Sequence, residues 1–467
     1  MSRILIKNAL VIVTMDDEER EIPGGDLLIS GETIEAVGSD IEATAETVID
    51  ASGKIVLPGF VNTHHHLYQT LFRVVPAVQD AKLFDWLLRL YETWREITPR
   101  GVEVGAKVGL GELLLTGCTT STDHFYLFPR SQPETLFDDL VAAAREVGIR
   151  FHPTRGSMSR GKSLGGLPPD DVVQAEEEIL RDCQRVIEKW HDPSPRSMLR
   201  VALAPCSPFS VTEDLLRETV RLARSHGVRC HTHLAETLDE ERYCLERYGA
   251  RPLEYMERLE WLGPDIWFAH AVHLDDAEIE RMGNTRTGVA HCPVSNLRLG
   301  SGIAPIVKML ERNVPVGLGV DGSASNDSSN MLGELKQALR IHRIDAGVDR
   351  MPARRVLRMA TRGGAEVLGY DEIGILAPGK AADVVLFDLE KIGYAGAMHD
   401  PVAALLFCGD DDRAHTTIVN GRIVVSEGRL LTIDEEALFA EANALAARFV
   451  GEASRKTGIP FLRREVE

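Results

Sequence analysis

Cysteine is scarce in this sequence and irregularly placed. The seven cysteines are scattered between Cys118 and Cys408, and no two of them form a Cys-x-x-Cys pair. An odd, scattered set argues against a disulfide framework, which is typical of small secreted domains. A long hydrophobic run is also missing, because the opening apolar segment is interrupted at Lys7 and Asn8. This excludes a membrane-spanning helix or a signal peptide there, and we expect a cytoplasmic protein with no membrane partner.

Positive charge is in deficit as well. The 467 residues include 52 lysines and arginines against 71 acidic residues, which gives a formal net charge of -19. Nucleic acids and anionic lipids both require a basic surface, so we expect neither as a partner. Hydrophobic residues make up 44% of the chain and charged residues 26%, so it can bury a large core and is not disordered throughout. A small-molecule partner is the remaining expectation.

Strands and amphipathic helices alternate through the middle of the chain. One helix is expected at 212–226, with Thr212 as its N-cap and Gly227 directly after its end. Eight such units predict an α/β fold, a (β/α)8 TIM barrel, whose active site lies at the C-terminal ends of its strands. The eight candidate strands are 58–64, 118–124, 149–154, 200–205, 228–233, 266–270, 288–292 and 315–321.

Short alternating strands occur at both ends of the chain, and neither end has enough of them to close a core alone. We therefore expect one small β-sandwich domain assembled from both ends. The expected domains are 1–57 with 371–430 for the sandwich, 58–370 for the barrel, and 431–467 for a C-terminal helical extension with a helix at 434–449. From the sequence, that extension could cap the β-domain or form an interface.

Polar clusters fall where the barrel strands are expected to end. In a strand, residues i and i+2 point to the same side, so His64 and His66 can bind one ion together. A single buried histidine is more often a hydrogen-bonded core residue, but several histidines and a carboxylate at the ends of different strands suit a divalent ion. The clusters are 62–66, 231–236, 270–273, 291–296 and 321–323.

These segments resemble the amidohydrolase superfamily, in its branch of mononuclear aromatic deaminases. The resemblance is carried by PGFVNTHHH (58–66), HTHLAET (231–237), FAHAVHL (268–274) and GVDGSASN (319–326). It implies one divalent metal ion per subunit, most simply Zn²⁺, with Fe²⁺ or Mn²⁺ as alternatives. The resemblance implies that the metal ligands are His64, His66, His233 and Asp321. It implies Glu236 and His270, with Asp321, as the catalytic residues. It also implies that His65, His231 and His273 are supporting residues.

The expected chemistry follows from this set. A bound ion lowers the pKa of its water from about 15.7 toward about 7 and so supplies a nucleophile at neutral pH. Asp321 can carry the water proton to the leaving amine, and His270 can orient the attacking oxygen. Glu236, three residues after a metal ligand, is placed to move a proton to a ring nitrogen.

Candidates for substrate binding are residues just past the barrel strands and an aromatic residue of the first long excursion. Gln69 and Arg155 offer donors to a flat heterocycle with carbonyls and ring nitrogens, although Arg155 could equally form a surface ion pair. We expect Trp86 to roof the pocket, with the other helix-spaced residues of 83–94 in the core. Tyr126 and Cys206 complete the set, and Arg73, His124, Ser295 and Asn296 are further candidates.

Four segments give a finer resemblance, to 8-oxoguanine deaminases: 122–129, 153–159, 203–212 and 291–302. It implies conversion of 8-oxoguanine and water to uric acid and ammonia. A deaminase of isoxanthopterin or guanine and a hydroxytriazine aminohydrolase are the alternatives. A non-catalytic hydantoinase-like scaffold is the alternative from another class, but it would be expected to have lost metal ligands. Symmetric assemblies are common, so we expect a homo-oligomer, as a dimer.

Overall fold

The computed structural model describes residues 2–463, and its centre is a closed eight-stranded parallel barrel. Each strand of the barrel lies within or beside a strand expected from the sequence. The barrel strands are almost completely buried, as is usual for parallel strands covered by helices. In barrel order they are β10 (Cys118–Phe125), β11 (Arg150–Ser157), β12 (Ala202–Pro205), β13 (Cys230–Leu234), β14 (Ile266–His270), β15 (Gly288–His291), β16 (Val316–Leu318) and β8 (Phe60–Asn62).

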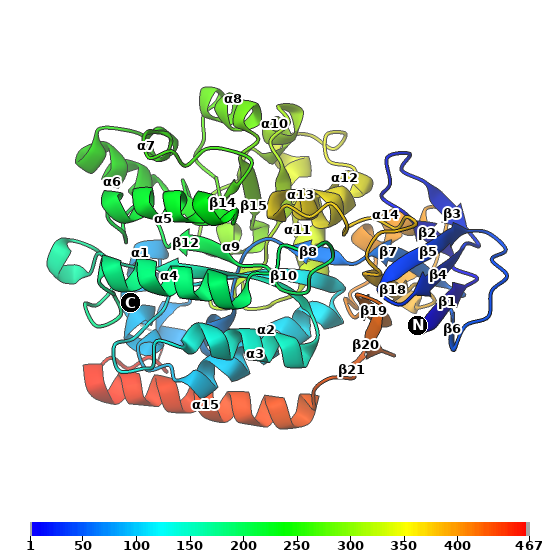
Figure 1. The fold of residues 1–467 in the computed structure, drawn as a ribbon, viewed down its shortest axis with the longest axis horizontal. Coiled ribbons are helices and arrows are strands. Elements are labelled where there is room, and N and C mark those ends of the chain that lie inside the picture. Colours follow the sequence, from blue (N-terminus) through cyan, green and yellow to red (C-terminus); the bar gives the residue numbers. More distant parts are fainter. Residues whose placement is uncertain (1, 464–467) are drawn as a thin grey trace.

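Helices surround the barrel (Figure 1). Thr212 caps α5 by accepting a hydrogen bond from the N–H of Leu215, and Gly227 ends it in the left-handed conformation, as predicted. The helices are α1 (Leu83–Trp94), α2 (Pro99–Leu115), α3 (Leu136–Val147), α4 (Glu176–Trp190), α5 (Glu213–His226), α6 (Leu238–Tyr248), α7 (Pro252–Arg258), α8 (Asp276–Thr285), α9 (Pro293–Arg298), α10 (Ile306–Glu311), α11 (Met331–Asp345), α12 (Ala353–Arg358), α13 (Gly364–Leu368) and α14 (Pro401–Phe407). Short helices are η1 (Leu67–Phe72), η2 (Pro76–Val78), η3 (Lys162–Leu164), η4 (Met359–Gly363) and η5 (Ile392–Tyr394).

Two further sheets form the β-sandwich at one end of the barrel (right in Figure 1), and the larger of them joins strands from both ends of the chain. A buried cluster between them includes Ile6, Ile29 and Val384. One sheet has the order β5 (Thr33–Gly38), β4 (Asp26–Ser30), β1 (Arg3–Lys7) and β6 (Thr47–Asp50). The other has the order β21 (Arg429–Leu430), β20 (Arg422–Ser426), β19 (Thr416–Val419), β18 (Val384–Asp388), β7 (Lys54–Pro58), β2 (Val11–Val13) and β3 (Glu21–Pro23).

The last helix, α15 (Glu435–Thr457), is longer than the expected 434–449. It packs against α1, α2 and η1, and Phe449 stacks on Phe72 with the ring centroids 6.1 Å apart. It therefore covers helices of the barrel rather than the sandwich (orange to red in Figure 1). Among residues 2–463, no helix combines the length and the apolar character that crossing a bilayer requires. The domain boundaries given above remain our proposal.

Candidate functional site

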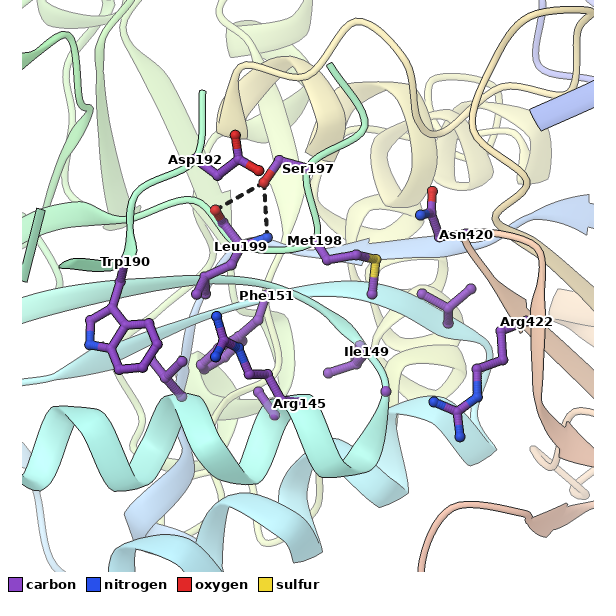
Figure 2. A pocket seen from close by; sticks show the side chains of 14 residues that line it. Arg145, Ile149, Phe151, Trp190, Asp192, Ser197, Met198, Leu199, Asn420 and Arg422 are labelled. Carbon is purple, nitrogen blue, oxygen red and sulfur yellow. Dashed lines mark hydrogen bonds between the residues drawn. The ribbon is translucent and has the colours of Figure 1, made fainter. Parts of the chain in front are cut away.

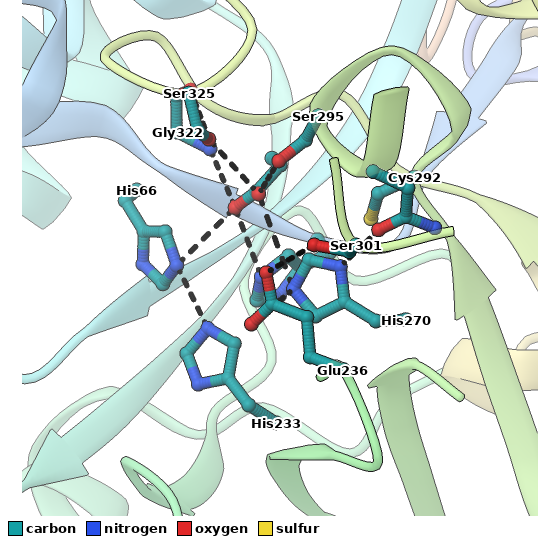
Figure 3. A network of polar contacts seen from close by, with 12 residues as sticks. His66, His233, Glu236, His270, Cys292, Ser295, Ser301, Gly322 and Ser325 are labelled. Atoms are coloured by element: carbon teal, nitrogen blue, oxygen red, sulfur yellow. Dashed lines mark hydrogen bonds and ion pairs between the residues drawn. The ribbon is translucent and has the colours of Figure 1, made fainter. Parts of the chain in front are cut away.

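The polar clusters expected at the strand ends come together at the carboxyl end of the barrel (Figure 3). A short parallel pair of strands, β9 (His65–His66) and β17 (Asp321–Gly322), brings the first and last clusters side by side. His233 belongs to β13 and His270 ends β14. Ring nitrogens of His64, His66, His124 and His233 lie within 4.8 Å of one another, and so do ligand atoms of His64, His270 and Asp321.

The Nε2 atoms of three of these histidines converge with one carboxylate. The Nε2 atoms of His66 and His233 are 3.0 Å apart. The Oδ1 atom of Asp321 lies 3.2 Å from Nε2 of His64 and 3.4 Å from Nε2 of His66. Three imidazole nitrogens and a carboxylate oxygen around one point form a donor set typical of zinc and similar ions.

The other ring nitrogens fix the tautomers. Nδ1 of His66 donates to the carbonyl of His124 at 2.8 Å, and Nδ1 of His233 donates to the carbonyl of Cys206 at 2.6 Å. Burial lowers the pKa of both rings, which are therefore neutral, and each Nε2 presents a lone pair. Two lone pairs 3.0 Å apart repel each other unless a cation lies between them, so these residues fit a metal ion.

His64 is held in the same way through a second histidine. Nδ1 of His231 donates to the carbonyl of Trp267 at 2.9 Å, which leaves Nε2 of His231 as an acceptor. Nδ1 of His64 donates to that acceptor at 2.7 Å, so Nε2 of His64 is free toward Asp321. Such outer contacts orient metal-binding imidazoles. His231 therefore orients His64 through this hydrogen bond.

Asp321 is held ionised. Its Oδ2 accepts hydrogen bonds from the hydroxyls of Ser295 (2.5 Å) and Ser325 (3.0 Å), and its Oδ1 accepts from the N–H of Gly322 at 2.7 Å. Burial alone would raise the pKa of this carboxyl, but the neighbouring histidines, His64 first, hold it well below its usual range. The site therefore has a charged carboxylate at the point where these histidine nitrogens converge.

Glu236 and His270 face each other beside this centre. Nε2 of His270 lies 3.7 Å from Oε2 of Glu236 and 3.9 Å from Oδ2 of Asp321, and its Nδ1 donates to Oδ1 of Asn296 at 2.9 Å. Burial opposes the charged ring, yet the two carboxylates outweigh it and raise the pKa of His270. Burial also raises the pKa of Glu236. Groups with shifted pKa values in a cleft are typical of acid–base sites.

Backbone strain is concentrated in the same place. Ala235, His270, Ala271 and Asp321 all have positive φ angles, of 52°, 70°, 49° and 62°. Residues other than glycine rarely adopt this conformation, and it costs of order 1 kcal/mol or more at each position. Surrounding hydrogen bonds must hold these turns, and the turns aim the side chains inward.

A cavity of about 440 Å³ lies over the centre. Of the five expected substrate-binding residues, Gln69, Trp86, Tyr126 and Cys206 line it. Burial raises the pKa of the Cys206 thiol to about 12, so this side chain is neutral. Sequence reasoning missed the apolar residues of the wall, which are Leu83, Leu87, Tyr91, Phe209 and Leu299. The helical spacing of residues 83, 87 and 91 beside Trp86 was the available signal, but it is the same as for a core-facing helix.

Arg155 does not line this cavity, and this expectation was wrong. Its fully buried guanidinium points to the helix side of β11, where Nε pairs with Asp182 of α4 at 2.7 Å and NH2 donates to Gln174 at 2.8 Å. It also stacks on Phe128, 3.8 Å from the ring centroid. Successive residues of a strand point to opposite sides, and Arg155 is on the outer side of the barrel. The pair is buried, so the surface ion pair was not the correct alternative either.

The other supporting histidines contact the site indirectly. Nε2 of His65 lies 3.0 Å from the hydroxyl of Ser329. Nε2 of His273 lies 2.9 Å from the carbonyl of Ser301, whose hydroxyl is 3.5 Å from Oε1 of Glu236. His273 therefore touches the loop beside Glu236 rather than the metal-binding residues.

A larger hollow lies at the opposite end of the barrel (Figure 2). Its volume is about 1060 Å³, and it lies near the start of β11 between α3 and the turn before β20. Arg145 stacks on Trp190 at its edge, 4.7 Å from the ring centroid. The lining contains no histidine or cysteine and one acidic residue, Asp192, so it offers no comparable ligand set.

The model of the amidohydrolase family matches residues 55–424. The chain is 46% identical to an 8-oxoguanine deaminase of Pseudomonas aeruginosa, over 96% of this chain and 100% of that protein. It is 35% identical to an isoxanthopterin deaminase from an unknown prokaryotic organism, over 96% and 97% of the two chains. The structure of atrazine chlorohydrolase TrzN from Arthrobacter aurescens TC1, solved with zinc, superposes with a TM-score of 0.91 at 36% identity, covering 95% of this chain and 100% of that one.

Proposed function

Since this chain belongs to the amidohydrolase family, we propose that it is a hydrolytic deaminase that converts 8-oxoguanine and water to uric acid and ammonia. The 46% identity to an 8-oxoguanine deaminase, over that protein's full length, is the observation that carries this choice. Isoxanthopterin deamination is the second candidate, because another relative of nearly equal length carries that name at 35% identity.

One divalent metal ion completes the proposed site. His64, His66, His233 and Asp321 would hold it, since their donor atoms converge and no lysine or arginine of residues 2–463 pairs with Asp321. When bound, the ion supplies Lewis acidity, which makes water a nucleophile near neutral pH. We propose Zn²⁺, which was present in the solved chlorohydrolase, with Fe²⁺ or Mn²⁺ as alternatives.

The remaining chemistry is proton transfer by the protein's own groups. Asp321, ionised and fixed by two serine hydroxyls, accepts the proton of the attacking water and passes it to the leaving amine. Glu236, with its raised pKa, carries a proton to the ring nitrogen beside the carbon under attack, which lowers the cost of breaking the ring's resonance. His270 faces both carboxylates and orients the attacking oxygen.

The cavity offers complementary polar groups to an oxidised purine. The carbonyl oxygen of Gln69 and the indole N–H of Trp86 are buried, and neither has a hydrogen-bond partner among residues 2–463. An unpaired acceptor and an unpaired donor suit a ring that carries both N–H groups and carbonyls. Tyr126 and Cys206 complete the polar wall, and the apolar residues of the wall suit a flat ring.

An ammonia-release assay on metal-loaded protein tests this function. It would compare 8-oxoguanine with guanine, isoxanthopterin and a hydroxylated aminotriazine, with ultraviolet detection of the product. Preference for 8-oxoguanine is the expected result, and release from another ring alone would reject the substrate. A protein that purifies without stoichiometric metal and releases no ammonia would instead be a scaffold. We also propose a cytoplasmic homodimer, which cell fractionation and light scattering would test.

A further inference from the structure

Two helices of the barrel begin with the same sequence signature, but their glutamates bind different partners. At the start of α8, Asp275 and Glu278 form an ordinary capping box. The N–H of Asp275 donates to Oε2 of Glu278 at 2.9 Å, and the N–H of Glu278 donates to Oδ1 of Asp275 at 2.8 Å. At the start of α6, Thr237 and Glu240 have the same spacing, and Thr237 accepts from the N–H of Glu240 at 3.4 Å.

The carboxylate of Glu240 does not return to its own N-cap. It reaches past Thr237 to the turn before it, where Oε1 accepts from the N–H of Ala235 at 2.9 Å and Oε2 accepts from the N–H of Glu236 at 3.0 Å. Both oxygens are therefore used on the two residues that place the Glu236 side chain. Ala235 is one of the strained residues of the site, with φ 52°.

The same turn is fixed from its other side. The carbonyl of Ala235 accepts from the N–H groups of Val272 and His273, at 3.0 and 2.9 Å. These residues follow β14, so the ends of β13 and β14 are joined through one peptide unit. Glu240 supplies the remaining hydrogen bonds, because it is the acceptor for the two amides that face α6.

Burial of the Glu240 carboxylate also costs more free energy than capping of a helix requires. It is 1% exposed, and within residues 2–463 it forms no ion pair. Glu278, equally buried, is instead neutralised by Arg251, whose NH2 lies 2.9 Å from Oε2. Burying an unpaired carboxylate near Glu236 costs stability, which a surface-facing N3 glutamate would avoid. The position of Glu240 is explained by the turn that it holds, not by capping of α6.

We propose that Glu240 is a positioning residue for catalysis, which holds the turn 235–236 so that the carboxyl group of Glu236 faces His270 and the cavity. This rests on the proposed function, in which Glu236 moves a proton to the substrate ring. Glu240 itself does not line the cavity. It acts on the reaction only through Glu236.

The test is Glu240→Gln, with Glu278→Gln as the matched control. The amide keeps one acceptor but places an NH₂ group against the second N–H. We expect kcat to fall on the order of tenfold or more with KM nearly unchanged, because a small misplacement of a catalytic group is costly. Glu278→Gln changes an N3 glutamate that is equally buried but is paired with Arg251 and binds its own N-cap, so it should leave kcat unchanged. Metal content should remain at the wild-type value in both.

Two further measurements separate positioning from a general loss of structure. Amide hydrogen exchange at residues 235 and 236 should accelerate in Glu240→Gln and not in Glu278→Gln. The double variant Glu236→Gln/Glu240→Gln should be no slower than Glu236→Gln alone, since Glu240 acts through Glu236. If Glu240→Gln is poorly folded, Glu240→Asp, which keeps the charge on a shorter side chain, is measured in the same way.

Unchanged exchange at 235–236, an unchanged kcat, or multiplicative effects in the double variant would each overturn the proposal. A wild-type protein that deaminates none of the four rings would reject the proposed function instead. In that case the exchange measurement, which needs no substrate, still decides whether Glu240 holds the turn.

Discussion

At the end of the barrel where the strands begin, one buried charge has an opposite charge as its partner. Arg150 is completely buried, and its Nε and NH2 atoms lie 3.1 and 3.2 Å from the carboxylate of Asp383. It also donates to Asn420 and to two backbone carbonyls. At the other end, Glu236, Glu240 and Asp321 are buried with no lysine or arginine paired to them among residues 2–463. Matched charge joins the barrel to the sandwich, whereas unmatched charge marks the place where a cation and a substrate belong.

The largest effect is expected where the unmatched carboxylate is removed. Asp321→Asn should lower kcat on the order of 10⁴-fold, because the residue is both a proposed ligand and a proton carrier. Metal content, measured by mass spectrometry of the purified protein, should fall with it. Full metal content together with unchanged turnover would show that Asp321 has neither role.

Glu236→Gln should separate proton transfer from metal binding. We expect kcat to fall by about 100-fold or more while the metal content stays at the wild-type value, since in the proposed mechanism the side chain carries a proton and does not bind the metal. Steady-state kinetics and metal analysis of the same preparation provide the check. Wild-type activity would exclude Glu236 as the proton carrier.

At the end of the barrel where the strands begin, we expect substitutions to change stability rather than turnover. Arg150→Met leaves Asp383 buried without its partner and should lower the free energy of unfolding by about 3–5 kcal/mol. The kinetic constants of the folded variant should stay within about twofold of wild type. Replacing Asp383 with Leu in the same variant should recover part of the loss in denaturant titrations. A changed kcat would contradict the contrast between the two ends.

The free energy of unfolding should depend on pH through Glu240, which lies at the carboxyl end of the barrel. Burial raises its pKa from 4.5 to about 7, so between these values the folded protein binds a proton that the unfolded chain has lost. The free energy of unfolding should therefore fall as the pH rises from 4.5 to 7, with Glu240 contributing up to about 3 kcal/mol. Denaturant titrations at both pH values should give a smaller drop in Glu240→Gln than in wild type. An equal drop in both would contradict the assignment.

The smallest effect is expected in the cavity wall. Trp86→Phe keeps the aromatic surface but removes the indole N–H, which has no hydrogen-bond partner among residues 2–463. Loss of one hydrogen bond to substrate, about 1 kcal/mol, should raise KM about fivefold with little change in kcat. Arg155→Met, by contrast, should leave KM unaltered, because Arg155 lies outside the cavity.

The sequence predicted most of this arrangement because the ends of parallel strands must meet. From the expected strand positions and the His64-x-His66 spacing, the sequence predicted that the donor atoms of the candidate site lie close together. The error at Arg155 arose because position after a strand does not tell which side of it a side chain is on. Glu240 could not be recognised, since Thr237-x-x-Glu240 and Asp275-x-x-Glu278 read alike and only the backbone beyond the N-cap differs.

The pairing of β7 with β18 has a consequence for synthesis. Lys54 and Asp388 are partners in one sheet, so the sandwich cannot close until the ribosome has made the whole barrel. At about 5–20 residues per second, the early strands wait roughly 15 to 70 s for their partners. During that interval the sheet edge of the nascent chain is open to other polypeptides. The period of greatest danger from aggregation therefore falls before translation ends, and slower translation would lengthen it.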